Sequence, residues 1–219
     1  MTETFSRARR PEQKQLRREH LLRTARGLLD EGVALHDLGL NELARRAEVS
    51  KANVYRYFES REAVLLALLW EEGGRVWIEL APRLRPGRRD TSTVQGLARV
   101  FARSYAEQPL LCALTAAVPG VLETNLTTET ITAFKHQMLE FFDQAATAFE
   151  RCCPDLSHAQ YMALFYDAIT LIVGLYPMHH PSPTAARALA APDLAFFRRD
   201  FSSEFERCLV ALATQYATA

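Results

Sequence analysis

Cysteine is scarce in this sequence. Four cysteines occur among 219 residues, and no two have the Cys-x-x-Cys spacing of zinc or redox sites. The chain also lacks a glycine-rich phosphate-binding loop, a Gly-x-Ser-x-Gly nucleophile motif and a His/Cys set at metal-ligand spacing. The adjacent His179 and His180 lie in a proline-containing loop where no third ligand is evident. These absences argue against an enzyme and predict neither a cofactor nor a metal.

Long apolar runs are absent as well. No stretch of 18 apolar residues occurs, so we expect no membrane span. The N-terminus is polar and basic, unlike a secretion signal. We therefore expect a cytoplasmic protein with reduced thiols. The adjacent Cys152 and Cys153 leave a redox-sensing role open as an alternative.

Net charge is also missing, because 26 basic residues balance 26 acidic ones. The distribution is uneven, however: residues 1–70 hold 13 basic and 10 acidic residues, and residues 1–28 hold 8 and 3. Basic charge gathered at one end suits contact with nucleic-acid phosphates. We interpret residues 1–10, with Arg7, Arg9 and Arg10, as a flexible basic arm that either touches DNA or is simply solvated.

Residues 40–58 have the pattern of two short helices joined by a tight turn. Apolar residues recur at helical spacing in the first helix, at Leu40, Leu43, Ala44 and Ala47. Gly39 and Ser50 are suitable N-caps for the two helices. In the second helix, Val54 and Phe58 lie four residues apart and can anchor it to a core. This pattern is typical of a helix-turn-helix.

The second helix of this unit has the composition of a DNA-recognition helix. Lys51, Tyr55 and Arg56 fall on the side away from the apolar anchor. A recognition helix must pack on one side and present basic and polar groups to the major groove on the other. The alternative is an ordinary helical hairpin with a solvated basic face.

The segment from Leu40 to Leu69 resembles the N-terminal DNA-binding domain of TetR/AcrR-type transcriptional repressors. The resemblance rests on Leu43-Ala44, Ala47-Glu48-Val49-Ser50-Lys51, Val54-Tyr55-Arg56-Tyr57-Phe58 and Ser60-Arg61-Glu62-Ala63-Val64-Leu65. Two positions depart from the family pattern. Glu48 stands where many members have a turn glycine, and Ala52-Asn53 stands where Gly-Thr is common.

The resemblance implies a set of DNA-contacting residues. Lys51, Tyr55 and Tyr57 match positions that touch the DNA backbone, although Tyr57 could mainly pack. Asn53 and Arg56 are candidates for contact with bases or backbone, and changes at Ala52 or Asn53 should alter sequence preference. Arg61 matches a basic residue that meets a phosphate. The implied partner is double-stranded DNA with a palindromic operator whose half-sites lie roughly 34–36 Å apart, or a multiple of that distance.

Helical patterns continue through the rest of the chain, so the predicted fold is all-α, with about nine helices. We expect the basic arm at 1–10, a three-helix helix-turn-helix domain at 11–60, a connecting helix at 61–82, and a ligand-binding and dimerisation domain at 83–219. Helices are predicted at 12–31, 61–80, 93–107, 110–123, 128–152, 157–176 and 193–216. Pro119-Gly120 should kink or split the fourth of these.

The last two predicted helices favour a homodimer. Residues 161–176 are apolar nearly all round, which is typical of a helix buried on all sides. The final helix adds an apolar stripe at Phe197, Phe201, Phe205, Leu209 and Leu212. In the resembling family these two helices form a four-helix dimer interface. A single monomer core is the alternative.

Family members usually bind a small molecule in the C-terminal domain, and we expect an apolar, aromatic-lined pocket here. The candidate residues are Phe101, Tyr105, Leu114, Phe134, Met138, Phe141, Phe142, Tyr161, Phe165, Tyr166 and Asp167. Asp167 lies inside an apolar helix, so it either meets a ligand or bonds a neighbouring helix or the dimer partner. His136 is either a polar group of the pocket or exposed.

Together these features predict a ligand-responsive, sequence-specific transcriptional regulator, most simply a repressor released by a small apolar or aromatic effector. The sequence does not identify that effector. The alternative within the same class is a DNA-binding regulator controlled by a partner protein or by cysteine oxidation.

Overall fold

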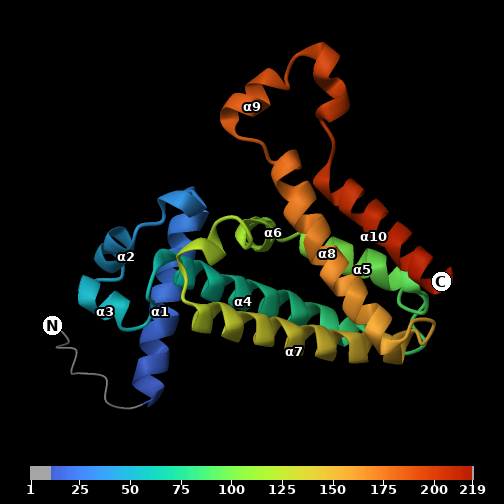
Figure 1. Cartoon of the computed structure of the whole chain (residues 1–219), viewed down its shortest axis with the longest axis horizontal. Helices are drawn as coiled ribbons and strands as arrows, with labels where there is room; N and C mark the ends of the chain where they lie inside the picture. The colour runs from blue at the N-terminus through green and yellow to red at the C-terminus, as the bar shows by residue number, and fades with distance from the viewer. Residues whose placement is uncertain (1–10, 219) are drawn as a thin grey trace.

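The computed structural model describes residues 11–218, so the predicted basic arm at 1–10 lies outside the described residues. Within that range the chain is helical and contains no strand (Figure 1). The α-helices are α1 (Pro11–Asp30), α2 (Leu40–Arg46), α3 (Lys51–Tyr55), α4 (Arg61–Leu80), α5 (Val94–Ala106), α6 (Pro109–Ala117), α7 (Thr128–Cys152), α8 (His158–His179), α9 (Pro183–Ala188) and α10 (Phe201–Thr218). Short 3-10 helices occur at η1 (Leu35–Asp37), η2 (Ala81–Arg83), η3 (Leu122–Asn125) and η4 (Pro192–Phe197).

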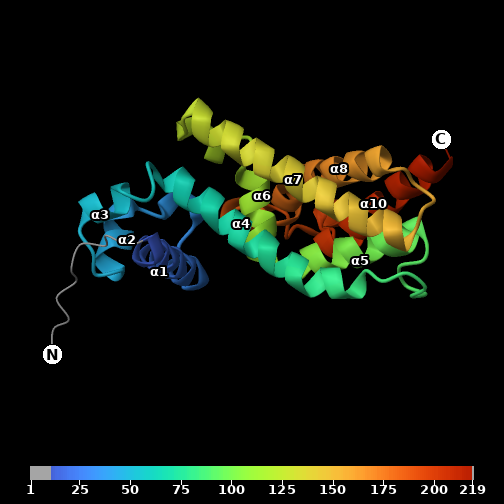
Figure 2. The same cartoon turned by 90° about the horizontal axis from the view of Figure 1, so that it is seen from below.

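Helices α1, α2 and α3 form a small head at one end of the molecule, and α4 runs from this head into the larger helical domain (Figures 1 and 2). One hydrophobic cluster packs the head and extends to Leu114, Leu122 and Phe134 of the second domain. A second cluster fills the larger domain, where α10 packs against α5 and α8. The first core thus joins the head to the far domain through the N-terminal half of α4.

Local capping sets the boundaries of the helix-turn-helix. Ser50 Oγ accepts a hydrogen bond from the Asn53 amide at 3.3 Å, and Ser60 Oγ accepts one from the Ala63 amide at 3.2 Å. Glu48 adopts a φ of 52° in the turn, which is the left-handed region that favours glycine. The prediction that α3 continues to Phe58 is wrong: the helix ends at Tyr55, and the chain turns to bury Phe58 in the core.

In the second domain the sequence patterns locate most helices. The helix predicted at 128–152 is found with those bounds, and Pro119-Gly120 splits the predicted fourth segment into α6 and η3. The last helix was placed wrongly at 193, because α10 begins at Phe201. Asp200 caps it by accepting a hydrogen bond from the Ser203 amide at 2.8 Å. Phe197 therefore lies outside the stripe of α10.

The predicted loop after residue 176 is also corrected. Helix α8 continues through Pro177 to His179, and the histidine pair closes the helix instead of lying in a loop. His180 stacks on Tyr176 with ring centroids 4.0 Å apart, and His179 Nδ1 lies 2.9 Å from the Arg199 carbonyl oxygen. Residues 181–200 then form an arm that projects from the body and contains α9 and η4 (Figure 1).

Helix α8 is long and apolar enough to cross a bilayer by length and composition alone. The sequence criterion of an uninterrupted run of 18 apolar residues did not identify it. It packs against α6, α7 and α10. One side buries Tyr161, Phe165 and Ile172, whereas Tyr166 on another side is 62% exposed. The apolar surface of α8 is therefore only partly covered within one chain.

Candidate DNA-reading surface and ligand cavity

The surface of α3 and of the turn that follows it presents most of the residues predicted to meet DNA. Lys51, Ala52, Tyr55 and Arg56 are exposed, and Asn53 and Tyr57 are half-buried. Lys51 Nζ lies 5.7 Å from the centre of the Tyr55 ring. Val54, between them, is fully buried and anchors the helix. The helix therefore packs by one side and leaves a basic and aromatic side free.

Arg61 has a different environment, because its guanidinium is already engaged within the protein. Nη1 donates to the His36 carbonyl oxygen at 2.5 Å, and Nε and Nη2 donate to Glu62 Oε1 at 3.0 and 2.6 Å. Glu62 is buried, which alone would raise its pKa. Hydrogen bonds from its own backbone amide, Arg61, Ser60 and Asn125 outweigh that effect and lower the pKa. Arg61 thus orders the start of α4, and its contact with a DNA phosphate stays a prediction.

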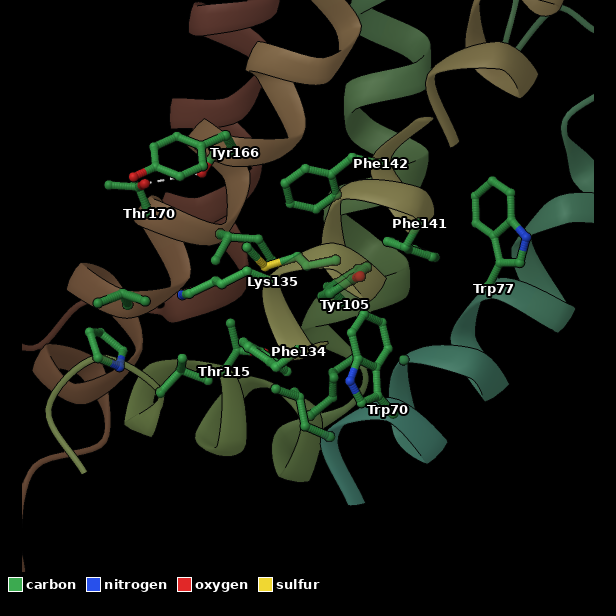
Figure 3. A pocket seen from close by; sticks show the side chains of 18 of the residues that line it. Trp70, Trp77, Tyr105, Thr115, Phe134, Lys135, Phe141, Phe142, Tyr166 and Thr170 are labelled. Carbon is green, nitrogen blue, oxygen red and sulfur yellow. Dashed lines mark hydrogen bonds between the residues drawn. The ribbon is translucent and has the colours of Figure 1, made fainter. Parts of the chain in front are cut away.

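The larger domain has a cavity of about 310 Å³ between α4, α7 and α8, with α5 and α6 also contributing to its wall (Figure 3). The cavity is open to solvent on the side where the exposed Lys135 and Tyr166 line it. Aromatic rings form much of its wall. Two pairs of rings join α4 to α7 across the cavity: Trp70 to Phe134, with centroids 5.7 Å apart, and Trp77 to Phe141, at 5.4 Å. Its size falls at the lower end of small-molecule sites.

Six of the predicted pocket residues line this cavity. They are Tyr105, Phe134, Met138, Phe141, Phe142 and Tyr166. The other five, Phe101, Leu114, Tyr161, Phe165 and Asp167, do not line it. Phe101 and Phe165 pack against Phe149 in the core, Tyr161 donates to the Cys153 carbonyl oxygen at 2.6 Å, and Leu114 is fully buried. Asp167 accepts a hydrogen bond from Tyr216 of α10 at 2.8 Å. His136 is exposed and lies outside the lining residues.

The wall contributed by α4 was missed by the sequence analysis. Trp70 and Trp77 are seven residues apart on one side of α4, and Gly73 and Gly74 lie between them. A Cβ atom added at either glycine would meet nothing within 4 Å, so the missing side chains contribute open space. The i, i+3, i+4, i+7 spacing of this set was the signal that could have identified it.

Polar contacts link the head to the cavity domain at the start of α4. Glu59 Oε1 accepts hydrogen bonds from Thr130 Oγ1 at 2.8 Å and from the Thr127 amide at 3.4 Å, both at the start of α7. Deeper in the molecule, Arg26 of α1 donates to the buried Glu72 of α4 at 2.5 Å. These contacts connect the head to the two helices that carry the facing cavity walls.

Comparisons with known proteins agree with this architecture. A family model described as "Tetracyclin repressor-like, C-terminal domain" matches residues 71–214, and one described as "Bacterial regulatory proteins, tetR family" matches residues 21–68. The chain belongs to the TetR family. This is a family of transcriptional regulators, not of enzymes, and membership implies operator DNA binding and, typically, a homodimer.

Individual relatives are more distant. An uncharacterized HTH-type transcriptional regulator of Mycobacterium tuberculosis is 38% identical over 56 residues, which span 24% of this chain and 28% of that protein. A TetR variant from Acinetobacter baumannii in complex with minocycline is 17% identical and has a TM-score of 0.53, covering 90% of this chain and 93% of that one. The fatty acid degradation regulator FadR from Bacillus halodurans is 14% identical, with a TM-score of 0.52 over 90% and 94%. Both likenesses concern the fold alone.

Proposed function

We propose that this TetR-family protein is a ligand-responsive, sequence-specific repressor that binds a palindromic operator as a homodimer and is released by a small effector in the cavity of the larger domain. The observation that carries the proposal is the position of α4. This helix begins directly after the helix-turn-helix and forms one wall of the cavity, so a ligand and an operator both act on the same rigid element.

The DNA-reading role is supported by the exposed side of α3. Tyr55 and Lys51 suit backbone contacts, because a phenol and an ammonium group both bond phosphate oxygens. The exposed Arg56 and Ala52 and the half-buried Asn53 complete the set, and their side chains are candidates for contact with base edges. Tyr57 is half-buried. Part of its side chain packs against the core of the head, and the exposed part is available to contact DNA.

The homodimer is supported by apolar surface that one chain leaves uncovered. Tyr166 of α8 is 62% exposed, and half-buried apolar side chains such as Met162 and Ile169 flank it. No residue of the arm at 181–200 is buried, and its Phe196 and Phe197 are 70% and 57% exposed. A second copy would cover these groups and would place two α3 helices on one DNA face.

Effector control follows from the way the cavity is built. The facing walls on α4 and α7 meet through two pairs of aromatic rings. A ligand inserted between these rings would shift α7 relative to α4. That shift would reach the head through the bonds of Glu59 to Thr127 and Thr130.

Control by cysteine oxidation is less well supported. The thiolate is the reactive form, and it is favoured by exposure and by positive charge nearby. Cys152 and Cys153 are buried, and burial raises the pKa of both thiols. Burial also raises the pKa of Cys112 to about 12. These three thiols thus have environments typical of inert cysteines.

Selection of DNA fragments from the genome of the source organism tests the DNA-binding half of the proposal. The full chain is expected to enrich a palindrome and to bind it with an affinity that falls steeply as salt rises, because phosphate contacts release counterions. Tyr55→Ala serves as the control and should lose affinity for every site. Failure of the wild type to enrich any sequence, with and without a metabolite library present, would refute a DNA-reading role.

A further inference from the structure

The polar groups of the cavity indicate which chemical class of ligand it takes, an inference that rests on the proposed role of the cavity as the effector site. The described residues that line it include no Asp or Glu. A cationic ligand would therefore find aromatic faces but no opposite charge. Cation–π attraction to the aromatic faces is weaker than the cost of burying a charge without a counter-ion, so this composition disfavours cations.

Anionic ligands are disfavoured for a different reason. Lys135 is the only Lys or Arg among the described lining residues. Its Nζ lies 2.5 Å from Glu123 Oε1, and this carboxylate oxygen is itself buried. A ligand carboxylate would have to compete with this ion pair for the lysine. The Lys135 ammonium is thus already paired within the protein, although its side chain is 46% exposed.

Trp70 supplies a hydrogen-bond donor that nothing satisfies. Its Nε1 is buried and has no hydrogen-bond partner among the described residues. In Figure 3 the indole nitrogen of Trp70 lies on the edge turned toward the other lining side chains, whereas that of Trp77 faces outward. An unpaired buried N–H destabilises the free protein, and a ligand acceptor would relieve that cost.

Three neutral hydroxyls add to this donor. Burial raises the pKa of Tyr105, so its phenol stays protonated. The hydroxyls of Tyr105, Thr115 and Tyr166 make no hydrogen bond within residues 11–218, and all three residues line the cavity. The free polar groups turned toward the cavity are therefore the Trp70 N–H and three hydroxyls, none of which is charged.

We infer that the cavity binds a neutral, two-ring-sized aromatic molecule that carries a hydrogen-bond acceptor, such as a ketone carbonyl, placed against the Trp70 N–H. The aromatic walls accept the rings by stacked and edge-to-face contacts. The carbonyl oxygen pairs with the donor that the free protein leaves unsatisfied. Carboxylated and cationic analogues of the same skeleton bind more weakly, because the site offers neither a free cation nor a carboxylate.

A pair of probes that differ only at the acceptor tests this inference on the full chain. Benzophenone has a carbonyl group where diphenylmethane has a methylene, and 4-benzoylbenzoate adds a carboxylate to the ketone. Binding of each is measured by calorimetry. Wild-type protein should bind benzophenone about three- to tenfold more tightly than diphenylmethane, the range of one neutral hydrogen bond, and should bind 4-benzoylbenzoate more weakly than benzophenone.

Two tryptophan variants assign the preference to a single atom. Trp70→Phe keeps an aromatic ring but removes the N–H, so the preference for the ketone should disappear. Trp77→Phe removes the other indole of the same cavity and should keep the preference. Circular dichroism confirms that both variants are folded.

The inference would be overturned if the wild type bound the two neutral probes equally, bound neither of them, or bound the carboxylate more tightly. An unchanged preference in Trp70→Phe would also overturn it. DNA selection is measured independently. If the predicted ligand preference is not observed, the DNA-binding proposal is therefore still tested separately by the DNA selection.

Discussion

Glu48 offers a sharp test of the helix-turn-helix geometry. Its φ of 52° places a non-glycine residue in the left-handed region, which costs about 1–2 kcal/mol. Replacement by glycine removes that cost. The greater conformational freedom of glycine in the unfolded chain, however, destabilises the folded state by about 0.5–1 kcal/mol. Glu48→Gly should therefore raise the free energy of unfolding by about 0.75 kcal/mol at the middle of these ranges, and by about 1.5 kcal/mol at most.

Glu48→Ala is the matched control, because it removes the same carboxylate and keeps the Cβ atom. Glu48 is exposed, so loss of the side chain alone should change stability little. For a chain of this size, a gain of about 0.75 kcal/mol corresponds to a melting temperature about 1–4 °C higher. Calorimetry or circular dichroism on the two variants and the wild type measures the difference.

The same variants separate backbone strain from electrostatics at the DNA. Both remove a negative charge beside α3 and should tighten nonspecific DNA binding by similar factors. Only the glycine variant should melt later than the alanine variant. If Glu48→Gly is no more stable than Glu48→Ala, the left-handed turn is not strained and this account of the turn is wrong.

Three further predictions concern DNA, the dimer and pH. Tyr55→Ala should weaken binding to all DNA sequences alike, whereas Asn53→Ala should change which sequences are preferred; a uniform loss from Asn53→Ala in binding titrations would contradict this division. Replacing both Phe196 and Phe197 with serine should shift sedimentation toward the monomer, and an unchanged dimer would remove the arm from the interface. The pKa of Glu62 is lowered in the folded protein, so its ionised form adds stability above the ordinary carboxyl pKa, and this stability is lost as pH falls through the folded value. Denaturation of Glu62→Gln at neutral and acid pH should therefore show a deficit at neutral pH that shrinks in acid; a deficit independent of pH would refute the assignment.

Features set by local chemistry were predictable from the sequence. The start of α4 follows from Ser60, which caps it, and the end of α7 at Cys152 precedes Pro154. The left-handed turn at Glu48 occurs at the position where the resembling family often has glycine. In each case a few neighbouring residues determine the backbone conformation, so no knowledge of distant contacts was required.

Features set by distant contacts were predicted only in part. Phe142 lines the cavity, whereas Phe165 does not, although the centroids of the two rings are only 6.0 Å apart. Both are aromatic residues on long helices, and only the packing of α5, α7 and α8 decides which faces open space. Trp70 and Trp77 were overlooked because α4 was interpreted as a mechanical connection and not as a cavity wall. The start of α10 was misjudged because Phe197 lies four residues before Phe201 and so continues the apolar spacing of the helix beyond its true start.

Reciprocal coupling between the cavity and the operator tests the central claim most directly. Operator affinity is measured with and without a saturating cavity ligand, and ligand affinity is measured with and without operator. The account predicts that each affinity falls by the same factor, since linkage of two binding free energies is symmetric. Gly74→Leu, which fills the open space beside α4, should bind operator yet lose the ligand effect. A ligand that occupies the cavity of the wild type without changing operator affinity would contradict the account.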